Sequence, residues 1–83
     1  MPRFTKRLDT QYGVLNFYFN RIIIDQQTYF HVSVMERNSR AVMFLMENKD
    51  DRWRIRNEPE PPGWVTLIEN ELSNSIIHHV EEV

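Results

Sequence analysis

The chain has 83 residues, of which 41% are hydrophobic, with two Trp, three Tyr, five Phe and a formal net charge of −2 at pH 7. This length and composition predict a single domain spanning residues 1–83 with one hydrophobic core, and they exclude a largely disordered chain. There is no cysteine, which excludes disulfides, thiolate metal sites and a cysteine nucleophile.

Three features of the sequence bear on location. Small secreted domains usually carry disulfides, so the lack of cysteine favours the cytoplasm. The chain starts with polar and basic residues, Met1 to Arg7, so we expect no secretory leader. No apolar run is long enough to span a bilayer, and we therefore expect no membrane partner.

The charges are divided along the chain. Residues 1–57 carry all ten basic residues against six acidic ones, whereas residues 58–83 carry six glutamates and no Lys or Arg. Two interpretations are open. An acidic helix can complement a basic sheet within one fold, or the two halves can form an electrostatic surface for a partner.

The first half of the chain predicts strands of differing clarity. Residues 3–9 alternate apolar and polar side chains weakly, and whether they form an edge strand is left open. Residues 14–24 form a clearer strand, with Leu15, Phe17 and Phe19 on one face. The alternation loses its phase near Asn20, which suggests a break or bulge at that point.

Three further strands are predicted over residues 28–36, 41–48 and 52–57. The last alternates strictly, so that Trp53 and Ile55 share one face and three arginines share the other. Residues 41–46 are apolar on both faces, which is typical of a central strand covered on both sides. One helix can cover only one of these faces, so the other needs a partner, a ligand or a second chain.

The proline-rich residues 57–63 are predicted to connect the sheet to a single helix over about residues 62–80. Its apolar face repeats at three- and four-residue spacing and comprises Trp64, Val65, Ile68, Leu72 and Ile76. We expect Ile68 to lie at the centre of the core, Ser73 to lie on the polar side, and Ile77 to be exposed in a monomer. The resulting fold class is α+β: an antiparallel meander of four to five strands with one C-terminal helix packed on one face.

The face of the sheet turned away from the helix is the candidate binding surface. Its predicted members alternate with the core residues and are Tyr18, Tyr29, His31, Met43, Leu45, Arg52, Arg54 and Arg56, with Ser33 beside them. Tyr, Met and Arg are enriched at protein interfaces, which favours self-association. Aromatics interleaved with arginines are also used to bind single-stranded nucleic acids. A third interpretation is that the arginines only solvate this face.

Two histidine arrangements are candidate chemical sites. The adjacent His78 and His79 lack the four-residue spacing that zinc-binding helices use, and helix-end capping is the favoured role. His31 and Ser33 share a face, but neighbours two apart on a strand lie about 6.5 Å apart, beyond a hydrogen bond. We therefore expect no enzyme activity, no metal site and no cofactor.

The order of elements, an antiparallel meander followed by one helix, resembles that of the transcriptional coactivator and purine-rich-element-binding family of single-strand binders. The resemblance covers the whole chain loosely and involves no shared signature residue. It implies single-stranded nucleic-acid binding and dimerisation. The residues themselves favour a small non-enzymatic interaction module that self-associates through the open sheet face, with nucleic-acid binding as the alternative.

Overall fold

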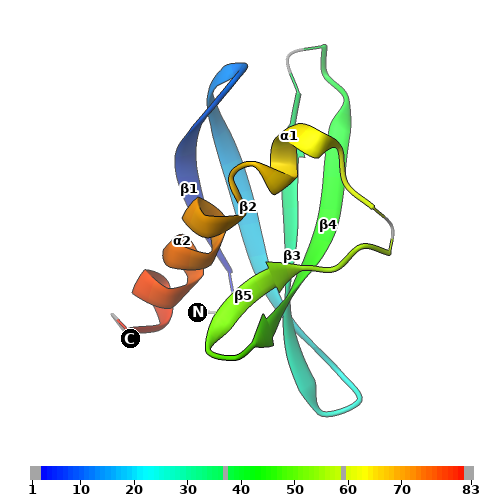
Figure 1. The fold of residues 1–83 in the computed structure, drawn as a ribbon, viewed down its shortest axis with the longest axis vertical. Helices are drawn as coiled ribbons and strands as arrows, with labels where there is room; N and C mark the ends of the chain where they lie inside the picture. Colours follow the sequence, from blue (N-terminus) through cyan, green and yellow to red (C-terminus); the bar gives the residue numbers. More distant parts are fainter. Residues whose placement is uncertain (1–2, 37, 59, 82–83) are drawn as a thin grey trace.

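The computed structural model describes residues 3–36, 38–58 and 60–81 of the chain (Figure 1). Five strands precede two helices: β1 (Arg3–Thr10), β2 (Gly13–Ile24), β3 (Gln27–Met35), β4 (Ala41–Lys49), β5 (Arg52–Ile55), α1 (Gly63–Thr66) and α2 (Glu69–Glu81). The strands form one antiparallel sheet in the order β1-β2-β3-β4-β5. The predicted α+β meander with a C-terminal helix is confirmed.

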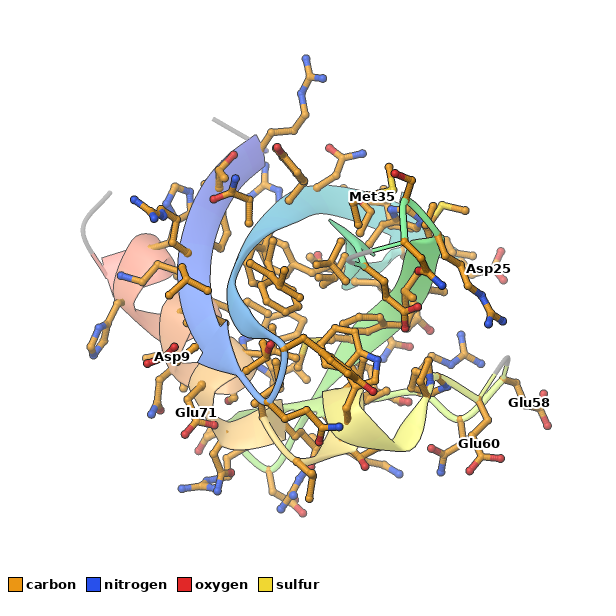
Figure 2. The ribbon with its side chains drawn as sticks, turned by 90° about the horizontal axis from the view of Figure 1, so that it is seen from above. Asp9, Asp25, Met35, Glu58, Glu60 and Glu71 are labelled. Carbon is orange, nitrogen blue, oxygen red and sulfur yellow. The ribbon has the colours of Figure 1, made fainter. Side chains whose placement is uncertain are left out.

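The sheet curls until its two edge strands both reach the same helix. α2 contacts β5 on one side and β1 on the other, and Figure 2 shows the strands and helices surrounding a central cluster of side chains. The acidic residues labelled in that view, such as Asp9, Glu58 and Glu71, point away from the centre (Figure 2). The fold is therefore an open barrel whose gap is closed by a helix.

Strand alternation determines the inward face, as the sequence predicts. The fully buried side chains are Phe17 and Phe19 of β2, Val32 of β3, and Phe44 and Met46 of β4. Trp53 and Ile55 of β5 are also buried. The segment 3–9 does form a strand, and its register places Phe4 opposite Phe19 and Leu8 opposite Leu15. Both side chains pack against the core as partly buried residues.

The bulge predicted near Asn20 is wrong. β2 pairs continuously with β1 from Arg3↔Asn20 to Thr10↔Gly13 and with β3 from Phe17↔Val34 to Ile24↔Gln27. The alternation fails for another reason: the turn end of the β2–β3 hairpin projects beyond the rest of the sheet (Figure 1), and residues 23–28 are all exposed. Toward this end the inward positions are the exposed Arg21 and Ile23, and the outward positions are Ile22 and Ile24, so burial no longer selects the residue type.

Two hairpins turn through residues with left-handed backbones. Asp25 and Gln26 join β2 to β3 with φ of 51° and 67°, and Asp50 and Asp51 join β4 to β5 with φ of 55° and 64°. Positive φ at both positions of a two-residue loop is the type I′ arrangement, which matches the twist of the flanking strands. Neither loop uses glycine, so each holds two L-residues in a strained region.

The single helix predicted over residues 62–80 is interrupted. α1 ends at Thr66, and the chain turns through Leu67 and Ile68 before α2 begins at Glu69. The interruption lets α1 bury Trp64 and Val65 at one end of the barrel while α2 buries Leu72 and Ile76 along the gap. One straight helix would hold all four side chains on a single stripe.

Three expectations for the helical segment are corrected by this arrangement. Ile68 lies at the turn and is only partly buried, so it is not the centre of the core. Ile77 packs against the core instead of being exposed. Ser73 is buried because it faces the edge of β5, where it makes a hydrogen bond. No described helix has the length and apolar character needed to cross a membrane.

Candidate interaction surface

The outward face of the sheet is built from residues that alternate with the core. Across the strands its side chains form rows. One row runs Thr5, Tyr18, Ser33 and Met43, and the next runs Arg3, Asn20, His31 and Leu45. Directly opposed side chains on adjacent strands are close neighbours, so each row is a continuous strip of surface.

Four of the predicted site residues lie together on this face. Tyr18 and Met43, which flank Ser33, are 52% and 56% exposed. His31 and Leu45 are adjacent to each other in the next row and are partly buried. These four residues make up the surface that we call the outer patch. It is flanked along β3 and β4 by the exposed Met35 and Ala41.

Two of the predicted arginines point elsewhere. Arg52 Nη1 donates a hydrogen bond to Asn70 Oδ1 at 3.2 Å, and Arg54 Nη1 lies 3.4 Å from Glu69 Oε1. Both partners belong to α2, so these guanidinium groups reach round the edge of the sheet to the helix. Alternation places Arg52 and Arg54 on the outward face, but their charged ends are not part of the outer patch.

Tyr29 and Arg56 form a separate pair beside the patch. The Arg56 guanidinium lies over the Tyr29 ring, 5.3 Å from its centroid, and Arg56 Nε is 3.7 Å from Glu47 Oε2. A cation over an aromatic face is attracted to it, so Arg56 already covers one face of the Tyr29 ring. Glu47 was not predicted as part of this group; the β3–β4 register, which places it opposite Tyr29, identifies it.

The charge division along the chain is therefore partly neutralised within the fold. Glu69, from the acidic half, faces Arg54 from the basic half. Arg56 instead meets Glu47, which belongs to the basic half. This arrangement supports the interpretation of an acidic helix complementing a basic sheet, although exposed ion pairs of this kind contribute little to stability.

A hollow opens on the same face toward β1. Its volume is about 470 Å³, and it is lined by Arg3, Phe4, Thr5, Tyr18, Phe19, Asn20, His31 and Ser33. Only Tyr18 and His31 were predicted as site residues. Ser33 was noted on this face, whereas Arg3 and Thr5 could be found only by pairing β1 with β2.

The two histidine arrangements have different outcomes. His31 and Ser33 both line the hollow. His79 stacks flat on Phe4 of β1, with the ring centroids 4.0 Å apart, and Phe4 stacks in turn on Phe19 at 4.4 Å. His79 therefore packs α2 against β1, which the sequence did not predict. Within residues 3–36, 38–58 and 60–81, no group of three or more His, Cys, Asp or Glu could hold a metal ion.

Comparisons of the chain with protein-family models, curated proteins and solved structures found no match. The function must be argued from the surface itself.

Proposed function

We propose that the protein is a small non-enzymatic interaction module that associates with a second copy of itself through the outer patch. The observation that carries the proposal is the exposure of Tyr18 and Met43 in the middle of a sheet face whose other side carries the core. Tyr and Met are enriched in protein interfaces, and a two-fold contact would use the same patch on both copies. A small domain also gains stability that its own core cannot supply.

The charges on this face are consistent with a second copy as the occupant. Arg54 and Arg56 already face carboxylates of their own chain, so the outer patch presents mainly apolar and neutral polar side chains. A surface of this kind can meet its own copy without repulsion between like charges. We place the contact in the cytoplasm, in keeping with a chain that has no cysteine.

Single-stranded nucleic-acid binding through the arginines is the weaker candidate. It requires Arg52, Arg54 and Arg56 to meet phosphates, but each already contacts Asn70, Glu69 or Glu47. A strand would have to replace these contacts. The test is the triple change of these arginines to Gln, which should abolish any binding or flatten its salt dependence.

The self-association is tested by replacing Met43 with Lys. A buried lysine at the centre of the contact carries an unpaired charge, so Met43→Lys should shift the protein to monomers with little effect on the fold. The matched control is Asn48→Lys, an exposed position on the same strand that faces the other way. Sedimentation across a dilution series measures the mass. A wild-type protein that is monomeric at the highest concentration, with a native spectrum, overturns the proposal.

A further inference from the structure

The hollow on the outward face has a regular construction. Arg3, Asn20 and His31 are consecutive partners across β1, β2 and β3, and Thr5, Tyr18 and Ser33 form the parallel row two residues along. The large side chains Arg3, Tyr18 and His31 stand beside the smaller Thr5, Asn20 and Ser33, which leaves the space between them. The hollow has a volume of about 470 Å³ and is half open to solvent, so a ligand in it would stay partly exposed.

The six polar side chains of the lining share one chemical character, although most of the lining surface is apolar. Each of the six side chains has an N–H or O–H group that can donate a hydrogen bond, and none is a carboxylate. In the part of the chain that the structure describes, none of the six makes a side-chain hydrogen bond or ion pair. Arg52, Arg54 and Arg56 at the other end of the sheet all have partners, whereas Arg3, Arg7, Arg21 and Arg40 have none among the described residues. Of these four, only Arg3 lines the hollow, so its guanidinium group is available to a ligand there.

We propose that this hollow binds one nucleotide unit, with its phosphate between Arg3 and His31 and its base against Tyr18. Adjacent strands lie about 4.8 Å apart, so Arg3 and His31 flank the Asn20 amide at a spacing that suits an anion held over it. A guanidinium group binds phosphate oxygens in a bidentate manner, and such charge-assisted hydrogen bonds are the strong ones.

The second row accounts for the base. Tyr18 stands between the small side chains of Thr5 and Ser33 and is half exposed, so part of its ring is open to a ligand. Stacking on an aromatic ring suits any base, while the hydroxyl groups of Thr5 and Ser33 can bond to its edge or to the sugar. The hollow is larger than an inorganic anion needs, which favours a ligand with both a phosphate and a planar group.

The experiment is a titration of ¹⁵N-labelled protein followed by amide chemical shifts, with AMP, adenosine, inorganic phosphate and a short oligothymidylate as separate probes. AMP should shift the amides of β1, β2 and β3 around the hollow and bind at least tenfold more tightly than adenosine or phosphate. Absence of saturable shifts with about 10 mM AMP, a concentration at which even weak millimolar binding is visible, overturns the proposal. Equal affinity for AMP and phosphate overturns the nucleotide assignment.

The variants identify the site. Arg3→Gln should weaken AMP binding at least fivefold, whereas the matched Arg7→Gln, an exposed position on the same strand and face but outside the hollow, should change it less than twofold. Tyr18→Leu should bring the affinity for AMP close to that for phosphate. Equal losses in the two arginine variants would show general charge attraction and overturn the site.

Two further measurements distinguish a free mononucleotide from a nucleic-acid strand as the ligand, and the nucleotide site from the self-association. An oligonucleotide that binds more than tenfold more tightly than AMP places the nucleotide unit in a strand, and equal affinities place it in a free mononucleotide. Tyr18 and His31 belong both to the outer patch and to the hollow, so a second copy and a nucleotide compete for them, and the mass is measured before AMP is added and at each titration point. A protein that is monomeric before AMP is added and binds AMP refutes the self-association alone. A protein that dimerises at high concentration but ignores AMP when dilute and monomeric refutes the nucleotide site alone.

Discussion

Glu69 of α2 makes two contacts with β5 through one carboxylate. Its Oε2 accepts the backbone N–H of Ile55 at 2.9 Å, and its Oε1 faces Arg54 at 3.4 Å. One turn further along, Ser73 Oγ accepts the backbone N–H of Trp53 at 3.0 Å. An edge strand normally leaves such donors open to water or to another chain. In this protein two helical side chains take the place of a sixth strand.

Replacing Glu69 tests this contact. Glu69→Ala leaves the partly buried Ile55 N–H without its acceptor, and it should lower the free energy of unfolding by about 1–3 kcal/mol. Glu69→Gln keeps an oxygen acceptor and should recover most of the loss. The control is the exposed Glu71, two residues further along the same helix. Glu71→Ala should change the free energy of unfolding by less than about 0.5 kcal/mol. Urea denaturation measures all three, and equal losses for the two alanine variants would contradict the edge contact.

At the scale of the elements, the helices attach to the sheet through specific contacts as well as apolar packing. Trp64 of α1 donates its indole N–H to Glu36 Oε1 at 2.9 Å. Glu36 follows β3, and its backbone bonds to Arg40 and Ser39 close the loop to β4. Trp64 also contacts Tyr12 at the β1–β2 turn, with ring centroids 5.6 Å apart. The four-residue α1 is thus held by two hairpins.

The β2–β3 hairpin is an element whose turn is poorly matched to its residues. Gln26 has a φ of 67°, a region that costs an L-residue about 1–2 kcal/mol. Gln26→Gly creates the Asp-Gly pair that type I′ turns favour. The relief of strain is partly offset because glycine has more conformational entropy in the unfolded chain, so the net stabilisation should be about 0.5–1 kcal/mol. Thermal and urea unfolding measure the change. Gln27→Gly, in the adjoining strand, should destabilise, and a similar loss at both positions would refute the turn assignment.

At the scale of the whole molecule, stability depends on one core shared by every strand and both helices. Trp53 enters it from β5, with its ring edge-on to Phe30 and the centroids 5.0 Å apart. The fully buried Leu72 and Ile76 of α2 belong to the same cluster. A domain of this size has few alternative contacts with which to compensate for a loss in the core.

Trp53→Ala should therefore cost about 3–5 kcal/mol, a large share of the stability of a small domain. The comparison variant is Tyr18→Ala, which removes an exposed aromatic side chain from the opposite face and should cost much less. Both are measured by urea denaturation monitored by circular dichroism. A Trp53→Ala protein that unfolds at the same urea concentration as wild type would show that Trp53 does not support the core.

The sequence predicts which side chains share a face of a strand better than it predicts which strand edges and helices come into contact. Alternation placed Phe17 and Phe19 on one face of their strand, and Trp53 and Ile55 on one face of theirs, because burial selects residue type at every second position. Alternation carries no information on which edges meet. The contact of Glu69 with Ile55 joins residues from different elements, and so does the stacking of His79 on Phe4.

The candidate site was predicted in part for the same reason. Tyr18, His31, Met43 and Leu45 follow from alternation within single strands, and the structure places them side by side. Arg52 and Arg54 share that face by alternation, but their long side chains reach acceptors on α2 that only the folded arrangement supplies. The hollow needs the register between β1 and β2, since Arg3 and Thr5 belong to the strand with the weakest pattern.

The order of the strands in the sheet has a consequence for synthesis of the protein. Because each strand pairs with the one before it in the sequence, the meander can grow one hairpin at a time as the chain leaves the ribosome, with short loops to close at each step. The edge of β5 is the exception. Its acceptors, Glu69 and Ser73, are translated after it, so the nascent chain carries a bare strand edge until α2 emerges. That interval is when the growing polypeptide is most exposed to pairing with its neighbours.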